Sequence, residues 1–130
     1  HDNTYEGNNI QSSAITFANP TANSHINGVF SGGKIYNNST KTNGGAIAIM
    51  ATDDNPGSVS VDIIEICDNK ASGKGGGIYT KFSGLGIEDD GTVKIYRNTA
   101  SEGKSIYAED SVVYYIGETD SYQGAYDDDI

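Results

Sequence analysis

Paired carboxylates are the feature of the sequence that most directly suggests chemistry. Asp53 and Asp54 are adjacent in one polar segment, and Asp89 and Asp90 are adjacent in another. Glycoside hydrolysis needs two carboxyl groups facing each other across a bond, whereas Ca²⁺ takes about six to eight oxygen ligands. Neighbouring acids in a loop usually form a solvated turn. We therefore expect no catalytic residue and no cofactor here, and these four acids remain candidates for Ca²⁺ only if their loops stack.

The other reactive side chains are isolated in the sequence. His1 and His25 lack the partners of a zinc-binding helix motif, and Cys67 has no second cysteine with which to form an intrachain disulfide. The glycine-rich run at 73–77 contains Lys74 but lacks the spacing of a phosphate-binding loop, and no helix is expected after it. These residues predict a protein that is not an enzyme.

Tyrosine is abundant, with nine copies and no tryptophan. Tyr79 and Tyr107 occupy equivalent outward positions, and Tyr36 and Tyr96 share another column beside Cys67. Exposed aromatic columns stack on sugars or bury against a partner, although tyrosine also suits strand surfaces in general. The four tyrosines are therefore a possible binding surface. In addition, residues 37–40 contain two overlapping glycosylation sequons.

Composition and charge narrow the class of protein. Gly, Asn, Ser and Thr supply 52 of the 130 residues, and glycine is costly inside helices, so we expect one domain with almost no helix. The formal net charge is −10, which repels nucleic acid and anionic bilayers. No apolar run is long enough to span a membrane, so we expect no direct membrane insertion.

An internal repeat predicts the architecture. The form Ile-x-x-Asn occurs three times, beginning at Ile35, Ile66 and Ile95 and ending at Asn38, Asn69 and Asn98. A glycine-rich step into an apolar residue follows each copy: Gly44-Gly45-Ala46-Ile47, Gly75-Gly76-Gly77-Ile78 and Gly103-Lys104-Ser105-Ile106. A divergent copy, Ser12-Ser13-Ala14-Ile15, lies 32 residues before the first full copy. A period of this length is typical of solenoids.

Alternation of apolar and polar residues predicts three short strands in each repeat. One follows the glycines, as at 46–50 and 77–81; a brief second one covers 59–61 or 85–87; the third covers 64–67 or 93–96. We therefore predict an all-β, right-handed parallel β-helix of about four coils of roughly 30 residues. The single domain divides into a divergent first coil (1–32), clear repeats (33–116) and an acidic C-terminal segment (117–130).

Stacking of the coils assigns structural roles to the repeated residues. The three isoleucines should point inward, and the three asparagines should form a ladder at one corner, where asparagine tolerates left-handed backbone geometry. The glycines suit a corner with positive φ or a close approach of backbones. The outward column Lys34, Glu65 and Lys94 alternates in charge, and Asp68 should lie beside Arg97.

These motifs resemble the repeats of the polymorphic outer membrane proteins of chlamydiae. Those repeats combine Gly-Gly-Ala-(Ile/Leu/Val), matched in full at 44–47, with Phe-x-x-Asn, which appears here with Ile in place of Phe. The resemblance covers about 33–116 and implies an extracellular or cell-surface segment that presents a repetitive adhesive surface. Its partners would be a longer parent chain or other copies of itself, and a host or glycan ligand is possible.

Two alternatives remain open. A short solenoid exposes unpaired strand edges at its ends, so the chain could instead be a filament or array subunit that stacks end to end. Many parallel β-helices are polysaccharide lyases or hydrolases; such lyases need an Arg or Lys base beside acidic calcium ligands, and the only arginine, Arg97, is already expected beside Asp68. The enzymatic alternative is therefore the less favoured of the two.

Overall fold

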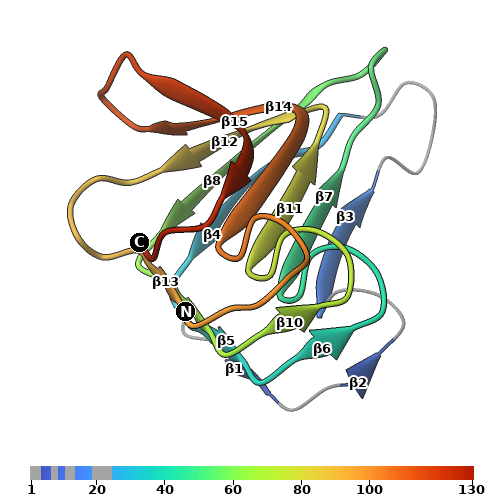
Figure 1. The fold of residues 1–130 in the computed structure, drawn as a ribbon. Coiled ribbons are helices and arrows are strands. Elements are labelled where there is room, and N and C mark those ends of the chain that lie inside the picture. Colours follow the sequence, from blue (N-terminus) through green and yellow to red (C-terminus); the bar gives the residue numbers. More distant parts are fainter. Residues whose placement is uncertain (1–3, 7–8, 11–13, 19–24) are drawn as a thin grey trace.

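The computed structural model describes residues 4–6, 9–10, 14–18 and 25–130 and shows a β-solenoid (Figure 1). Thr4 pairs in parallel with Lys34, Lys34 with Glu65, and Glu65 with Lys94. The repeat is therefore close to 31 residues, and the chain completes about three turns before β13 begins a further one. The described residues form no helix, so none of them belongs to a helix that could cross a membrane.

Each turn contains strands in four positions, and strands in the same position lie side by side. The first position holds β1 (Thr4–Glu6), β5 (Lys34–Tyr36), β9 (Glu65–Cys67) and β13 (Lys94–Tyr96). The second holds β2 (Asn9–Ile10), β6 (Ser39–Thr40) and β10 (Lys70–Ala71). The third holds β3 (Ile15–Ala18), β7 (Ile47–Met50) and β11 (Ile78–Lys81), and the fourth holds β4 (Asn27–Ser31), β8 (Gly57–Asp62) and β12 (Ser83–Ile87). The long strand β14 (Ile106–Tyr115) spans the third and fourth positions.

The predicted parallel β-solenoid is confirmed, and its three predicted strands per coil are present. The structure adds the two-residue strands in the second position, such as β6 and β10, which pair in parallel through Ser39 and Lys70. A strand of two residues is too short to show alternation, so the sequence pattern could not reveal it. The divergent first copy also has the expected register where it is described, because Ile15 pairs with Ile47; Ser12 and Ser13 lie outside the described residues.

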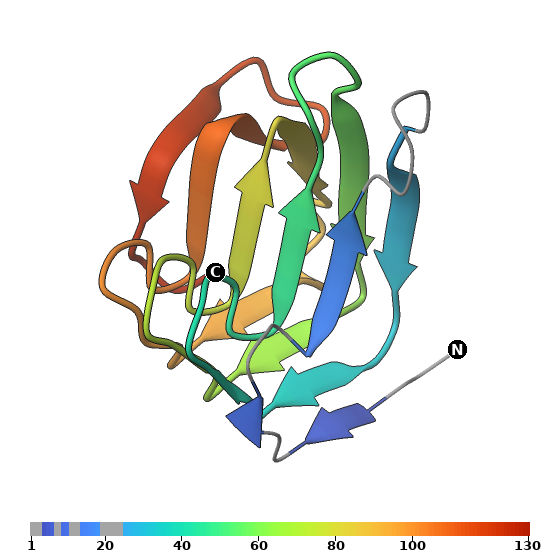
Figure 2. The ribbon, with the colours of Figure 1, turned by 90° about the vertical axis from the view of Figure 1, so that its right-hand side faces the viewer.

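The core is a stack of aliphatic side chains enclosed by the strands. Ile35, Ile66 and Ile95 are at most 2% exposed, and they face the interior from neighbouring strands of the first position. The third and fourth positions contribute further columns, among them Ile47, Ile78 and Ile106 and Val59, Leu85 and Val113. Figure 2 shows β3, β7, β11 and β14 as neighbouring strands on one wall of the solenoid. Stacking of repeats thus buries a core that no single turn could form alone.

The C-terminal segment covers the strand edges of the last turn. β15 (Ser121–Tyr126) pairs antiparallel with β14, and Ile130 exchanges two backbone hydrogen bonds with Ile95 at 2.8 and 2.7 Å. The carboxylate of Asp127 accepts a hydrogen bond from the Lys104 N–H at 2.8 Å. The acidic C-terminal segment therefore caps one end of the solenoid, because its backbone supplies the hydrogen bonds that an exposed parallel edge lacks.

Candidate functional site

The ladder corner, formed by Asn38, Asn69 and Asn98, joins the first and second strands of successive turns. Nδ2 of Asn38 donates a hydrogen bond to Oδ1 of Asn69, and Nδ2 of Asn69 donates to Oδ1 of Asn98, both at 3.0 Å. The backbone N–H groups of Asn38 and Asn69 donate to the same two oxygens at 3.1 and 2.9 Å. All three side chains are at most 5% exposed. The ladder therefore satisfies its own polar groups and leaves no amide for a ligand.

Left-handed backbone geometry occurs one residue before each ladder asparagine. Asn37, Asp68 and Arg97 have φ values of 57°, 57° and 52°, so the expectation that the ladder asparagines themselves adopt this geometry is wrong. The chain therefore turns one residue before the side chain enters the corner. The predicted contact between Asp68 and Arg97 is confirmed: the guanidinium donates from Nε at 2.7 Å and from Nη2 at 2.6 Å. This bond lowers the pKa of the Asp68 carboxyl.

The repeated glycines serve both of the expected steric purposes. Gly44 and Gly75 have φ values of 73° and 72°, a left-handed conformation that favours glycine. The next residues are glycine because backbones approach closely: a Cβ at Gly45 would lie 2.1 Å from the carbonyl oxygen of Gly76, and a Cβ at Gly76 would lie 2.4 Å from that of Lys104. These positions maintain the stacking of the turns and contact no open surface.

Tyr36, Cys67 and Tyr96 form one outward column, since Cys67 pairs with both tyrosines in the parallel sheet. The Tyr96 hydroxyl donates to the carboxylate of Glu65, which also lies 3.0 Å from Lys34 Nζ. The hydrogen bond from Tyr96, followed by the lysine contact, lowers the pKa of Glu65. Cys67 is only 1% exposed, and this burial raises the pKa of its thiol. This shift disfavours the thiolate, which is the nucleophilic form of cysteine.

Tyr79 and Tyr107 also stack, with ring centroids 6.3 Å apart and planes 9° apart. The expectation that Tyr79 is exposed is wrong, because its side chain is 2% exposed. Its hydroxyl donates to Glu109 at 2.5 Å, and burial followed by this bond raises the pKa of Tyr79. Tyr107 is half-buried and receives a hydrogen bond from Lys74 Nζ at 3.1 Å. Only Tyr107 of this pair is partly exposed, so the two rings do not form the open aromatic column that was expected.

The two acidic pairs proposed for calcium do not stack. Asp53 and Asp54 lie in the connection between β7 and β8, whereas Asp89 and Asp90 lie in the connection between β12 and β13. The first connection enters β8 and the second leaves β12. Because β8 and β12 are neighbouring parallel strands, the two connections lie at opposite ends of the fourth position and the four carboxylates do not converge. Within the described residues, no group of three or more His, Cys, Asp and Glu side chains is arranged to hold a metal ion. The prediction that these four acids coordinate Ca²⁺ together is therefore wrong.

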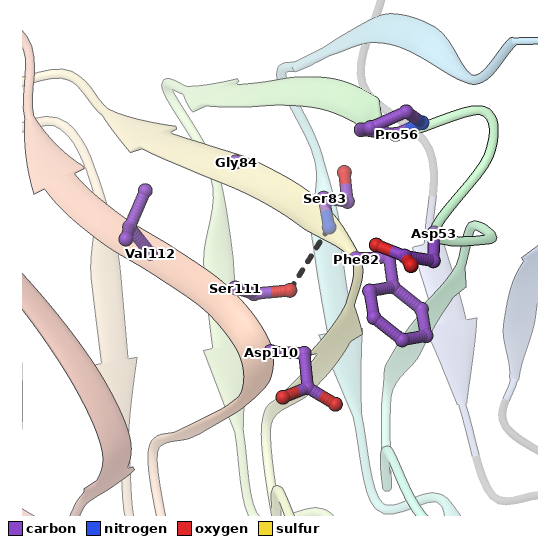
Figure 3. Close-up of a pocket in the computed structure, with 8 residues that line it drawn as sticks. All are labelled: Asp53, Pro56, Phe82, Ser83, Gly84, Asp110, Ser111 and Val112. Atoms are coloured by element: carbon purple, nitrogen blue, oxygen red, sulfur yellow. Dashed lines mark hydrogen bonds between the residues drawn. The ribbon is translucent and has the colours of Figure 1, made fainter.

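A recess that the sequence reasoning missed lies where the third and fourth positions meet. In the turn that contains β11 and β12, Phe82 alone makes this corner, whereas the preceding turn uses six residues, 51–56. An open recess of about 250 Å³ lies at this corner, beside Asp53 and Pro56 of the longer connection (Figure 3). The recess is lined by Asp53, Pro56, Phe82, Ser83, Gly84, Asp110, Ser111 and Val112. We call this group the loop corner; the unequal spacing of the repeats is the sequence signal that could have revealed it.

Ser83 is the residue of the loop corner whose hydrogen bonding is incomplete. Its backbone N–H donates to Oγ of Ser111 at 2.9 Å, drawn in Figure 3. Its side chain is 1% exposed, yet Oγ has no hydrogen-bond partner among the described residues. Buried hydroxyls are normally paired, so the loop corner contains a polar group that the protein itself does not satisfy.

The two overlapping sequons differ in accessibility. Asn38 is 1% exposed and bonded within the ladder, whereas Asn37 is exposed. In the folded chain, only the first of these two asparagines presents its amide to solvent.

Comparison with known proteins identifies one segment. Residues 63–81 match the Chlamydia polymorphic membrane protein (Chlamydia_PMP) repeat. That segment contains Ile66 and Asn69 of the ladder motif together with Gly75, Gly76 and Ile78 of the glycine step, so the matched repeat corresponds to the turn from the end of β8 to the end of β11. Neither the curated proteins nor the solved structures gave a significant match. The chain is thus a β-solenoid that carries a repeat of this type.

Proposed function

We propose that this chain is a surface-exposed β-helix segment that displays a binding face on a cell or particle, without catalytic activity. The observation that carries the proposal is the repeat match at 63–81, because it falls on the turn whose ladder and glycine geometry recurs through the structure. The repeat takes its name from membrane proteins of chlamydiae, which supports a location at the outer membrane or cell surface. A rigid solenoid suits this role because it holds its outward residues at fixed spacing.

The arrangement of the ends favours this function over filament assembly. β15 and Ile130 hydrogen-bond to the last turn, so at that end a second copy would have to displace them before it could add a parallel strand. Displacement would break the two bonds of Ile130 to Ile95 and the antiparallel pairing along β14. We therefore propose a display role and expect the purified chain not to polymerise end to end.

Surface labelling tests the location. Antibodies against the folded chain should label intact cells that produce the parent protein, and brief external protease treatment should remove the signal. Permeabilised cells provide the control for total protein. Labelling that appears only after permeabilisation would reject the surface assignment.

Adhesion of coated beads tests the binding role. Beads that carry the folded chain should attach to cultured epithelial cells more often than beads that carry the Gly76→Ala variant, whose turns cannot stack normally. Equal attachment of both kinds of bead would contradict a role for the folded surface. Incubation with pectin and related acidic glycans, with and without Ca²⁺, provides the parallel test for catalysis, and detectable cleavage would overturn the non-enzymatic assignment.

A further inference from the structure

The C-terminal segment (117–130) occupies the strand edge that a further turn of the solenoid would use. β15 pairs antiparallel along both halves of β14, and Ile130 exchanges backbone hydrogen bonds with Ile95 of β13. β13 and β14 hold the first, third and fourth strand positions, where the described strands of successive turns pair in parallel. The segment therefore covers the last turn in the direction opposite to that of the repeat.

The segment also supplies hydrogen-bond acceptors that the next turn supplies elsewhere. One turn earlier, the N–H of Gly76 donates to the carbonyl oxygen of Gly103 at 3.0 Å. Lys104 is the equivalent of Gly76, because Ile78 pairs with Ile106 two residues further on. Its N–H donates instead to the carboxylate of Asp127 at 2.8 Å. An aspartate side chain thus takes the place of a backbone carbonyl of the next turn.

The same replacement occurs beside the ladder corner. The N–H of Asp68 donates to the carbonyl oxygen of Tyr96 in the next turn at 3.4 Å. Arg97 is the equivalent of Asp68 in the last turn, and its N–H donates to the carboxylate of Asp129 at 3.3 Å. Two separate parts of the last turn are therefore bonded to the segment as they would be bonded to a following turn.

The opposite end of the solenoid presents strand edges without the usual protection. β3 and β4 each pair with one neighbouring strand among the described residues, and Figure 2 shows β3 and β15 at opposite ends of one row of strands. Exposed edges usually carry lysine, proline or a bulge that discourages pairing. Neither β3 nor β4 contains a charged residue or proline, and Val29 of β4 is 68% exposed. These edges suit the addition of another strand.

The inward side chains at the two ends are complementary. Successive strand pairings place Ile15, Phe17 and Phe30 in the same columns as Ile106, Ala108 and Tyr115, respectively. A first turn stacked on β14 would set Phe17 against Ala108, a large side chain against a small one, which lets two layers interdigitate. It would also place the ring of Phe30 beside that of Tyr115.

We propose that the C-terminal segment is an autoinhibitory cap, and that its displacement lets the last turn bind the first turn of a second copy in the parallel register of the repeat. The contact joins different surfaces of the two copies, so it adds copies head to tail into a filament. With the segment in place the chain stays single, as the display role requires. The proposal goes beyond that role and does not depend on it.

A specific protease site in the exposed connection 117–120 tests the proposal, because the chain folds before the segment is cut. Anion exchange in mild denaturant then removes the acidic segment, and circular dichroism checks that the stripped chain keeps its strands. Sedimentation velocity at rising concentration should show the stripped chain growing to about fivefold the mass of one chain or more. The uncut chain should stay single. Excess synthetic peptide 117–130 should reverse the growth, as it would not for aggregates of unfolded chain.

Val29→Pro in the same chain isolates the proposed junction. The carbonyl of Ile26 accepts from the Ser58 N–H, and the N–H of Gly32 donates to the Asp62 carbonyl, so both residues face β8. Alternate residues of a strand point their backbone groups to opposite neighbours, so the Val29 N–H faces the free edge, where proline is tolerated. Val29→Pro should therefore abolish growth of the stripped chain. Val29→Ala keeps the N–H, should assemble like the unchanged chain, and is the matched control.

Four outcomes would overturn the proposal. A stripped chain that unfolds would make the segment an integral strand and not a cap. A stripped chain that stays folded and single at every concentration would show that the last turn does not bind a second copy. Growth that Val29→Pro leaves unchanged, or that the peptide does not reverse, would place the contact elsewhere. A mass that stops at two chains would mean that two C-terminal ends pair with each other.

Discussion

The ladder corner and the loop corner occur in the same solenoid, but they differ in how completely their buried polar groups are paired. At the ladder corner, equivalent residues in successive turns are identical, so each amide bonds to the next and all three are buried. At the loop corner, equivalent turns differ in length and residue type, and the hydroxyl of Ser83 has no partner among the described residues. Regular stacking therefore pairs the buried polar groups of successive turns, whereas the break in the repeat leaves one buried hydroxyl unpaired.

The largest expected effect comes from a substitution that creates a steric clash between the stacked turns near the ladder corner. Gly76→Ala places a Cβ 2.4 Å from the Lys104 carbonyl oxygen and 2.7 Å from that of Thr99. Because backbone atoms cannot move aside, we expect a loss of at least about 3 kcal/mol in the free energy of unfolding. Gly84→Ala is the matched control from the loop corner, since its Cβ meets nothing nearer than 3.8 Å. Thermal unfolding followed by circular dichroism measures both, and equal melting temperatures would contradict the steric account.

A second prediction removes the central rung of the ladder. Asn69→Ala deletes the acceptor for Asn38 and the donor to Asn98, and it leaves buried polar groups unpaired. We expect a loss of about 2–3 kcal/mol, because several hydrogen bonds fail together. Chemical denaturation gives the value directly. A loss below about 0.5 kcal/mol, the usual range for exposed sites, would show that the ladder is not the main restraint on stacking.

Lowering the pH should destabilise the region of the loop corner and not the ladder corner, by less than either substitution above. The hydrogen bond from Tyr79, together with Lys81 Nζ at 3.3 Å, lowers the pKa of Glu109, which directly precedes Asp110 of the loop corner. This stability is present above the unfolded pKa of about 4.3 and disappears as the pH falls through the lower folded pKa. Glu109→Gln should therefore show a smaller loss of melting temperature between pH 6 and about pH 3 than the unchanged chain.

The magnitude of that acid effect should stay below about 1 kcal/mol, because Glu109 is partly exposed and solvent screens it. The ladder amides do not titrate in this range, so they contribute nothing to the slope. Ser83→Ala retains Glu109 and should show the full acid sensitivity. An unchanged slope in Glu109→Gln would mean that other carboxylates, such as Asp68 beside Arg97, dominate acid unfolding.

The smallest expected effect on stability is that of Ser83→Ala, which tests directly whether the loop corner contains an unpaired polar group. Ser83→Ala removes a hydroxyl that has no partner among the described residues, so stability should change by less than about 0.5 kcal/mol and can rise. Ser111→Ala removes the acceptor of the Ser83 N–H at 2.9 Å and should cost about 1 kcal/mol. If Ser83→Ala is the more damaging of the two, the Ser83 hydroxyl has a structural partner and the contrast between the two corners fails.

Much of the fold could be predicted from the repeat. The spacing of Ile35, Ile66 and Ile95 placed one residue per turn at the same position, and the parallel pairing between their strands has that register. The loop corner could not be predicted in the same way. Phe82 and Asp110 have unrelated side chains, so no motif links them, and only the paired neighbours Lys81 and Glu109 show that they occupy equivalent positions.

The sequence by itself determined which residues stack, because a solenoid brings together side chains that recur at one period and these must tolerate each other. It therefore determined the solenoid, its inward isoleucines and its asparagine column. Only the tertiary structure decided the burial of Tyr79, the separation of the two acidic pairs, the cap formed by β15 and the recess beside residues 51–56. Those features depend on how far a connection projects and what covers it, and three-dimensional packing sets both without leaving a period in the sequence.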